Sequence, residues 1–442
     1  MRRIWEVVVP RWAERNLRVL LLARIAMSVG RAVAAVVTAL YLAAVGFSAV
    51  KIGVLFVCVT MVSALMSSAI GLLADRVGRR PFLVAVPLLA AAAGVAYAVS
   101  RDTVVLFVAA SLGSFGRGAG AGAGNVGPYQ PAESALVAET VRPENRAAAF
   151  ARLSFVSSIG ALLGGLAAAV VRTRPGMTAA EATVAYRPAF LIAAGLAVLS
   201  GVLALWIREP AHERSAGRQR LPRWPRRSWP ALWRFWVTNS INGAGIGMFG
   251  PFVSYWFFRR YGASPATIGM LFALINVGTL LPTLAASRIA RRLGTVRAIV
   301  AVRVIGGALL VPMVLAPSFW LAGALYFVRM MVQRVGLPLR QSFTQDMADP
   351  RERASVAALS NLPAQATMAG GQAAAGWLFD QVDLAAPFVL AAVFQIANAV
   401  AYWALFSRRP PRPTGPDPDD HPSGRADDTA AGTTLRSASG LP

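Results

Sequence analysis

Glu133 most directly suggests chemistry in this 442-residue chain, because it is a carboxylate inside a long apolar stretch. A buried carboxylate can bind and release a proton, and its proton affinity depends on burial and on neighbouring cations. We therefore interpret Glu133 as the proton-binding group, with Arg31 or Arg117 as its neighbouring arginine. Histidine is excluded from this role because His212 and His421 lie outside the apolar stretches.

Other polar residues in the apolar stretches are candidates for binding a small-molecule substrate. They are Arg31, Arg117, Tyr129, Asn239, Asn242, Arg329, Gln333 and Arg334. An ionised side chain at mid-bilayer costs at least about 2.5 to 3.5 kcal/mol unless it reaches water or a partner. We therefore expect these residues to face a shared cavity. Arg24, Arg303 and Arg340 lie nearer the ends of their stretches, and we interpret them as extending to the membrane interface.

These residues leave two classes of substrate open. Arginines outnumber the single embedded glutamate, which favours an anion or a solute rich in hydrogen-bonding groups. The same stretches are rich in alanine and glycine and contain Met27, Phe115 and Met248, which equally suit a hydrophobic, drug-like molecule.

The candidate residues lie on twelve apolar stretches, each close to the 20 or so residues that cross about 30 Å of hydrocarbon. The stretches cover residues 18–45, 52–73, 82–100, 104–138, 147–171, 187–207, 232–258, 266–287, 298–316, 319–339, 354–379 and 385–407. Hydrophobic residues make up 56% of the chain and charged residues 14%, a balance that a soluble chain of this length does not show. The sequence therefore predicts an all-α membrane protein with twelve transmembrane helices in a lipid bilayer.

The net charge of +24 is distributed in a way that predicts membrane orientation rather than a nucleic-acid partner. Basic residues concentrate in alternate loops, namely Arg76, Arg79, Arg80, Arg142, Arg146, Arg288, Arg291, Arg292 and Arg297. Loops rich in arginine and lysine remain on the cytoplasmic side of a membrane. We therefore expect both termini in the cytoplasm and a multi-pass location in a bacterial cytoplasmic (inner) membrane.

Two segments of the chain repeat one another. Gly46, Ser48, Ile52, Gly53, Leu55 and Phe56 return as Gly262, Ser264, Ile268, Gly269, Leu271 and Phe272. Each pair is separated by the same 216 positions (262 minus 46), as are Arg76 and Arg292. A tandem duplication in apolar sequence predicts two pseudo-symmetric bundles of six helices with a pathway between them.

The duplication and the composition together predict four regions. Residues 1–207 form the first bundle and residues 232–407 the second. Residues 208–231 form a cytoplasmic linker rich in proline and arginine, which either rests on an anionic membrane surface or is disordered. Residues 408–442, rich in proline, glycine, aspartate and serine, form a disordered cytoplasmic tail.

The loop after the second stretch carries a family resemblance. It reads Gly71-Leu72-Leu73-Ala74-Asp75-Arg76-Val77-Gly78-Arg79-Arg80 and closely resembles the Gly-x-Leu-x-Asp-Arg-x-Gly-Arg-Arg signature of the major facilitator superfamily. Arg117 in a glycine-rich fourth stretch is similar to that family's fourth-span arginine motif. Gly160 to Gly165 partly resemble the fifth-span glycine motif of its proton-coupled antiporters, although such glycines also serve ordinary helix packing.

The resemblance implies the major facilitator fold and alternating access, in which two bundles rock about a central substrate site. It also implies a gating loop made of Gly71, Asp75, Arg76, Gly78, Arg79 and Arg80. Glycines 71 and 78 would permit a tight return between helices. We further hypothesise that Asp75 contacts the start of the eleventh span, near Arg351 or Arg353, and so latches the cytoplasmic side shut.

We expect a secondary transporter that couples proton movement to efflux of a drug or hydrophobic metabolite. The alternatives are proton-coupled import or export of an organic anion or sugar, and a membrane sensor that transports nothing. An enzyme is not expected, because the sequence offers no nucleophile-base motif and no phosphate-cradling loop. Cys58 is the sole cysteine, so we expect no cysteine-based metal site and no cofactor, and we expect a monomer.

Overall fold

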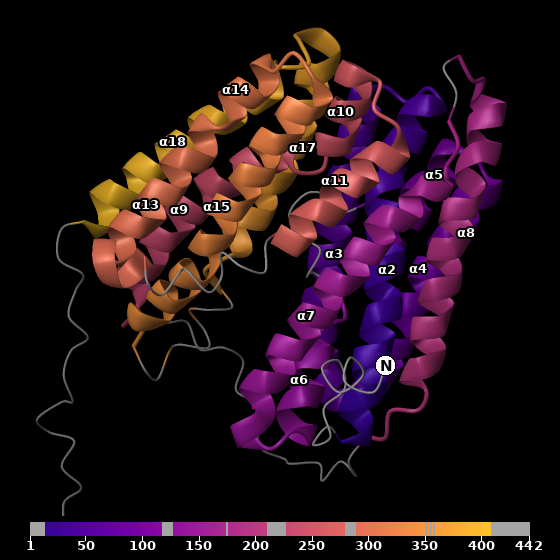
Figure 1. The fold of residues 1–442 in the computed structure, drawn as a ribbon. Coiled ribbons are helices and arrows are strands. Elements are labelled where there is room, and N and C mark those ends of the chain that lie inside the picture. Colours follow the sequence, from indigo (N-terminus) through magenta and orange to yellow (C-terminus); the bar gives the residue numbers. More distant parts are fainter. Residues whose placement is uncertain are drawn as a thin grey trace, which may run out of the picture.

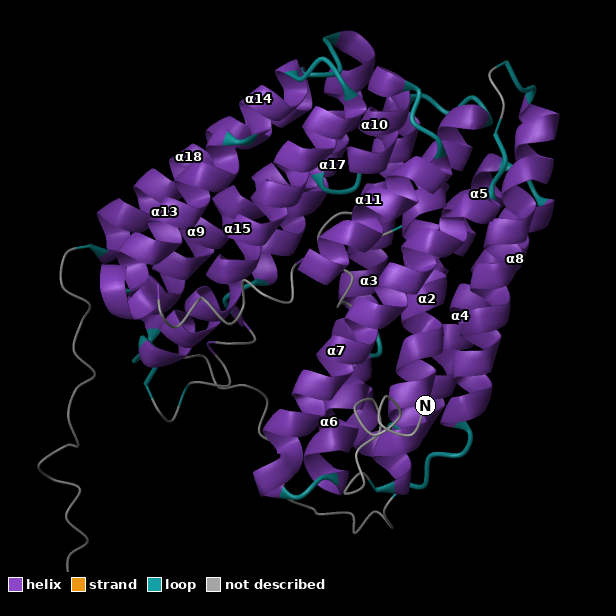
Figure 2. Cartoon of the chain, viewed as in Figure 1, coloured by secondary structure: helices purple, strands orange, loops and turns teal. Residues whose placement is uncertain are grey.

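The computed structural model describes residues 14–116, 127–173, 176–209, 227–278, 289–349, 352, 356 and 359–407. Helices joined by turns make up these residues, and no strand occurs among them (Figure 2). The predicted all-α class is therefore confirmed. Arg117, most of the linker and the whole tail lie outside the described residues, so the expectations for them remain predictions.

The first half of the chain forms the helices from α2 to α8. Their bounds are α2 (Arg15–Ala44), α3 (Ala49–Val77), α4 (Arg80–Val99), α5 (Thr103–Gly113), α6 (Gln130–Thr140), α7 (Pro143–Ala167), the 3₁₀ turn η1 (Ala168–Val170) and α8 (Ala179–Ala204). α8 begins well before residue 187, the predicted start of the sixth span. A capping box explains this difference, because Thr178 and Glu181 each accept a hydrogen bond from the other's backbone N–H.

The second half forms the helices from α9 to α18. Their bounds are α9 (Trp229–Phe249), α10 (Val253–Tyr261), α11 (Pro265–Gly278), α13 (Thr295–Ala308), α14 (Leu310–Leu315), α15 (Phe319–Asp346), α17 (Leu362–Gln381) and α18 (Ala386–Phe406). Across the described residues, seven helices are long and apolar enough to cross a membrane. The described helices fall along the twelve predicted spans, with several spans divided.

Three predicted spans consist of two helices each, which the apolar pattern did not reveal. In the fourth span, α5 ends before Ser114, which has a left-handed φ of 52°, and α6 starts at Gln130. In the seventh span, Gly250 and Pro251 separate α9 from α10. In the ninth span, α13 ends and α14 begins just before Pro312. The proline explains this break, because it has no backbone N–H to donate the hydrogen bond that would continue α13.

The two halves use the same packing scheme. In the first half, α2 packs on α7 and α8, and α4 packs on α5 and α8. In the second half, α9 packs on α17 and α18, and α13 packs on α15 and α18. These pairs occupy corresponding places in the duplicated sequence, and Figure 1 shows them as two bundles side by side. The predicted two-bundle fold is therefore confirmed.

The bundles meet mainly at two helix pairs, α3 with α17 and α7 with α11, and α2 makes smaller contacts with α10 and α11. Glycines permit both close approaches. A Cβ added to Gly269 would lie 2.1 Å from the carbonyl oxygen of Gly165, and one added to Gly53 would lie 3.2 Å from the Cα of Gly376. Gly53 and Gly269 are equivalent members of the sequence repeat. The repeat therefore marks the surfaces on which the bundles pack against one another.

Hydrogen bonds between the bundles lie toward one end of the molecule, which we call the closed end. Asp380 in α17 accepts hydrogen bonds from the backbone N–H groups of Ala49 and Val50, at 2.9 and 2.8 Å. Deeper in the same contact, the hydroxyl of Thr60 donates to the side-chain oxygen of Gln372 at 3.1 Å. Toward the other end, the open end, where α2 begins and α3 turns into α4, the two bundles diverge (Figure 1).

Candidate functional site

Glu133 lies in a buried ion pair inside the first bundle. Its side chain is 3% exposed, and its Oε2 atom accepts a hydrogen bond from Nη1 of Arg24 in α2. The Nε atom of Arg24 also donates to the hydroxyl of Ser157 in α7, at 2.5 Å. One arginine therefore links three helices of the bundle. The other carboxylate oxygen, Oε1, has no hydrogen-bond partner among the described residues.

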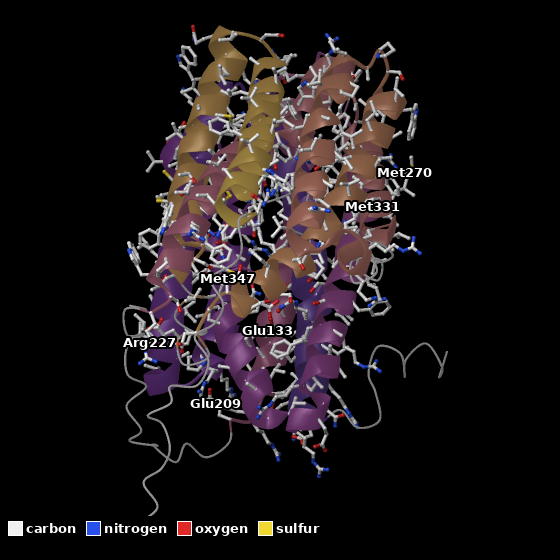
Figure 3. All side chains as sticks on the ribbon, turned by 90° about the vertical axis from the view of Figure 1, so that its left-hand side faces the viewer. Glu133, Glu209, Arg227, Met270, Met331 and Met347 are labelled. Atoms are coloured by element: carbon white, nitrogen blue, oxygen red, sulfur yellow. The ribbon has the colours of Figure 1, made fainter. Side chains whose placement is uncertain are left out.

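The break in the fourth span decides where this carboxylate lies. Because α6 starts at Gln130 with Pro131 in its first turn, Glu133 also falls in the first helical turn. The unpaired N–H groups of a helix start favour a negative charge there. Glu133 is also well inside the bundle, while Glu209 lies near the open end (Figure 3). The start of α6 therefore adds to the stabilisation that Arg24 gives to a negative charge on Glu133, and burial opposes both.

The arginine that pairs with Glu133 is not one of the two expected. Arg24 makes this bond, and Arg117 lies outside the described residues. The interpretation that Arg24 extends to the interface is wrong, because this residue is only 6% exposed and its guanidinium group points into the bundle. Arg31, which lies on α2 like Arg24, has an interaction of its own. Tyr129 is buried beside the pair and, with Arg24 and Glu133, lines a space of about 10 Å³.

A larger cavity of about 170 Å³ lies inside the second bundle, among α9, α13, α15 and α18. Figure 3 looks onto this bundle, with Met331 of α15 labelled. The polar side chains of the lining are Asn242, Arg303, Gln333, Arg334, Arg340 and Gln395. Ile246, Ile299, Val302, Met330 and Leu337 supply the apolar part. Among the described residues of the lining, three are arginines and none is acidic.

Neutral groups hold Arg303 in this cavity and Arg329 beside it. Nη1 of Arg303 donates to the side-chain oxygens of Asn242 and Gln395, the latter at 3.2 Å. Arg329 is fully buried next to the cavity, with its guanidinium 4.0 Å from the centre of the Phe249 ring and its Nε bonded to the carbonyl oxygen of Gly306 at 3.0 Å. A ring face and amide oxygens attract these cations but leave their charge uncompensated.

Two buried donors near the arginines remain unused. The Nε2 group of Gln395 and Nη2 of Arg329 have no hydrogen-bond partner within the described part of the chain. Their side chains are both almost completely buried. Donors buried without a partner lose about 1 to 3 kcal/mol relative to water. Because Gln395 lines the cavity, an acceptor there would recover part of this loss at its Nε2 group.

The sequence-predicted candidates divide between the two sites and a structural role. Asn242, Gln333 and Arg334 line the cavity, and Arg329 lies beside it. Asn239 instead donates to the carbonyl oxygen of Ser360 at 2.8 Å, which ties α9 to the segment before α17. Among the described residues, no group of three or more His, Cys, Asp and Glu side chains could hold a metal ion.

The predicted gating loop is built around Gly78 and Glu209. Gly78 has a φ of 100°, and a Cβ at this position would lie 2.5 Å from the carboxylate of Glu209. That carboxylate accepts hydrogen bonds from the N–H groups of Arg79 and Arg80, the latter at 2.6 Å, and so caps the start of α4. The side chain of Arg79 pairs with Glu139 at 2.5 Å.

Two expectations about this loop have different outcomes. Gly71 was expected in the tight return but lies inside α3, so only Gly78 serves the turn. The latch between Asp75 and Arg351 or Arg353 involves side chains outside the described set, so it remains a prediction, as does any role of Arg76.

Sequence reasoning missed several residues that now matter. Ser157, Gln395, Asp380 and Glu209 were not selected. Attention to every polar residue in the apolar stretches would have found Ser157 and Gln395, because both lie within predicted spans. Asp380 and Glu209 act through backbone N–H groups that no sequence pattern displays.

Comparison with known proteins decides the family. The family model of the Major Facilitator Superfamily matches residues 20–241 and 235–437, which together cover most of the chain. The chain belongs to the major facilitator superfamily. The resemblance inferred from the loop between α3 and α4 is confirmed.

Relatives within the superfamily match over a short length. An uncharacterised MFS-type transporter, YceJ of Bacillus subtilis (strain 168), is 26% identical over 132 residues, which cover 30% of this chain and 34% of that protein. Multidrug resistance protein MdtH of Cronobacter sakazakii is 32% identical over 121 residues, 27% of this chain and 28% of that protein. The chain thus aligns with about a third of the length of these curated relatives.

Solved structures of the superfamily share the fold over most of the chain. An auto-inhibited peptide transporter of the POT family has a TM-score of 0.70 at 13% identity, covering 91% of this chain and 98% of that chain. The nucleoside transporter NupG has a TM-score of 0.69 at 14% identity, with 89% and 99% covered. A bacterial homologue of the human lysosomal transporter Spinster has a TM-score of 0.68 at 15% identity, with 88% and 96% covered.

Proposed function

We propose that this chain is a secondary active transporter that works by alternating access and couples proton entry to export of its substrate. The observation that carries the proposal is the buried Glu133–Arg24 pair, which joins three helices of one bundle. Protonating Glu133 would remove its negative charge and so weaken its attraction for Arg24 inside the bundle. Breaking a buried ion pair costs about 3 to 5 kcal/mol, enough to shift a conformational equilibrium.

The fold supports the alternating-access part of this proposal. Glycines bring the backbones of the two bundles close together at α3–α17 and α7–α11, and small residues at such contacts leave few bulky side chains to hinder a change in helix tilt. The open end carries Arg79, Arg80, Arg142, Arg291 and Arg292. By the positive-inside rule this end faces the cytoplasm, so we propose that both termini are cytoplasmic and that the structure represents an inward-facing state.

Export and the location are part of the same proposal. MdtH is named as a multidrug resistance protein, which supports export of a drug or hydrophobic metabolite. The aliphatic side chains in the lining of the second-bundle cavity suit the apolar body of such a molecule. We place the protein in the bacterial cytoplasmic membrane as a monomer, with residues 208–231 as a linker between bundles 1–207 and 232–407.

The test uses proteoliposomes loaded with one solute at a time: ethidium as a cation, lactose as a neutral sugar, or benzenesulfonate as an anion. An acidic outer solution should accelerate release of the transported solute by the wild-type chain, because protons enter as substrate leaves. The Glu133→Gln variant should still release that solute down its concentration gradient but should no longer respond to the pH difference.

A matched control is Glu144→Gln, which removes an exposed carboxylate from the first turn of α7 in the same bundle. This variant should respond to acid as the wild type does. The proposal fails if Glu133→Gln responds to the pH difference as strongly as Glu144→Gln, or if the wild type releases no solute faster under acid than at equal pH.

A further inference from the structure

We propose that the cavity in the second bundle binds the anionic group of an organic anion, and that this anion is the exported substrate. The inference rests on the proposed transport function and specifies its substrate class. A carboxylate, sulfonate or phosphate group would bind among Arg303, Arg334 and Arg340, with its apolar body against the aliphatic part of the lining.

The balance of charge carries the proposal. Arg303, Arg334 and Arg340 all line one cavity, and the part of its lining that the structure describes contains no acidic residue. Arg329, buried beside the cavity, adds a fourth cation to the same bundle. Cations gathered in a space of low dielectric repel each other and any positively charged solute. An anion in the cavity would remove that repulsion.

The hydrogen-bonding groups point to the same ligand. Gln395 lines the cavity, is 1% exposed and keeps its Nε2 donor without a partner among the described residues. Its Oε1 is already used by Arg303, so Gln395 presents donor groups rather than an acceptor. Arginine, with five N–H donors in a planar fork, binds carboxylate, sulfonate or phosphate oxygens in pairs. A ligand with several negatively charged acceptor oxygens would satisfy all of these donors.

The shape and the apolar lining limit the size of the ligand. The cavity measures about 170 Å³, and an apolar cavity of roughly 150 Å³ in another protein is known to hold benzene. Ile246, Val302 and Met330 supply an apolar surface beside the arginines. An aromatic or short aliphatic body with one acidic group therefore fits better than a large dianion or a sugar.

The difference between the two bundles strengthens the assignment. The Arg24 guanidinium of the first bundle already has the carboxylate of Glu133, so it has no need of an anionic ligand. In the second bundle, amide oxygens and a ring face hold Arg303 and Arg329, and both interactions are weaker than a bond to a carboxylate. The cavity is therefore the place where a negative charge would be most stabilised.

The test measures binding by titration calorimetry, with the purified full-length chain in a non-ionic detergent and no proton gradient. The three probes each contain a benzene ring and differ in charge: benzenesulfonate is an anion, benzylammonium a cation and benzyl alcohol neutral. Benzenesulfonate is charged at every accessible pH, so it does not cross membranes as a neutral acid. The wild type should bind benzenesulfonate at least about tenfold more tightly than either other probe, the factor expected for one additional charged hydrogen bond.

Variants locate the binding site. Arg340→Gln should weaken benzenesulfonate binding about tenfold, and Arg340→Lys should recover part of the loss because it restores the charge. Arg259→Gln removes an exposed arginine of α10 outside the cavity and should bind as the wild type does. The temperature of thermal unfolding, measured for each variant, shows which of them are folded. Arg303→Gln gives a second test of the cavity.

Four results would overturn the inference. Equal binding of benzenesulfonate and benzylammonium by the wild type would show that charge is not recognised. An unchanged affinity in folded Arg340→Gln and Arg303→Gln would place the anion elsewhere. Displacement of benzenesulfonate by phosphatidylglycerol, with no sulfonate release from proteoliposomes, would make the cavity a lipid-headgroup site. Acid-driven release of ethidium or lactose without benzenesulfonate binding would reject the anion and leave proton-coupled transport intact.

Discussion

The two bundles share a framework but treat buried positive charge in opposite ways. Each bundle uses the same helix pairs, and equivalent glycines, Gly53 and Gly269, form the contacts between bundles. In the first bundle Arg24 is neutralised by Glu133. In the second, Arg303 and Arg329 are held by amide oxygens, a carbonyl oxygen and an aromatic ring. The backbone scheme has survived duplication while the charges have diverged.

This difference suggests a division of labour. A carboxylate paired with an arginine can bind a proton. The proton removes the negative charge and so weakens the ion pair. Arginines without a carboxylate can exchange an anion instead. Duplicated halves can therefore take separate roles without any change in the helices that carry them, since a few side chains decide the charge of each interior.

The largest expected effect comes from removing one arginine from each bundle. Arg24→Met should lower the free energy of unfolding in detergent at neutral pH by about 3 to 5 kcal/mol, because Glu133 is left charged and buried. Arg329→Met should cost about 1 kcal/mol or less, because no carboxylate is left behind and an apolar side chain fills the space. Chemical unfolding followed by circular dichroism measures both.

The double variant Arg24→Met with Glu133→Gln tests the reason for the first effect, because it should recover much of the stability lost in Arg24→Met. Arg101→Met, at an exposed site between α4 and α5, should change stability by no more than about 0.5 kcal/mol. Equal losses in Arg24→Met and Arg329→Met would remove the distinction between the bundles.

A second effect tests what the bundles share. Gly269→Ala and Gly53→Ala should each destabilise the closed-end contact by about 1 to 3 kcal/mol, because the added Cβ meets backbone atoms of the facing helix. The thermal unfolding temperature should fall in both variants. Gly195→Ala is the control, since no atom lies within 4 Å of a Cβ there. A fall in only one of the glycine variants would show that the two interbundle contacts are not equivalent.

A third, smaller change gives the second bundle what the first already has. Gln395→Glu places a carboxylate at the 3.2 Å contact with Arg303. The stronger charged hydrogen bond should raise the free energy of unfolding by about 1 kcal/mol and should weaken benzenesulfonate binding. Asn398→Asp adds the same charge at a residue outside the cavity lining and serves as the control for binding. Tighter benzenesulfonate binding by Gln395→Glu would contradict the charge argument.

The smallest effect concerns an asymmetry at the closed end. At the start of α3, the capping side chain is Asp380 of the opposite bundle. At the start of α11, the capping side chain is Ser264, which directly precedes that helix and accepts a hydrogen bond from the N–H of Thr267. Asp380→Ala should weaken the closed-end contact by about 0.5 to 1 kcal/mol. Distances between spin labels at positions 46 and 382, in a Cys58→Ser background, should shift toward longer values. Ser48→Ala, which removes only a local cap, should leave the distribution unchanged.

Most of the fold could be predicted from sequence, because apolar stretches and a constant repeat offset can be seen directly in the order of the residues. The boundaries could not. Local chemistry decides them: the capping box at Thr178 extends α8, and Ser114 and Pro251 interrupt stretches that are apolar throughout. Such breaks change which residues lie at equal depth without changing hydrophobicity.

The candidate site was predicted in part. Glu133 could be selected by residue type, since an isolated carboxylate in an apolar stretch is costly. Its partner could not, because Glu133 lies on a separate helix that starts at Gln130, a boundary that the apolar pattern does not show. Gln395 was missed, and its place in the cavity lining is known only from the structure.

The central claim is that one bundle responds to protons and the other binds the anion. The most direct test measures benzenesulfonate binding and acid-driven benzenesulfonate release for Glu133→Gln and Gln395→Glu side by side. The account predicts that Glu133→Gln retains binding and loses the response to acid, while Gln395→Glu loses binding about tenfold. Equal loss of both properties in both variants would contradict it.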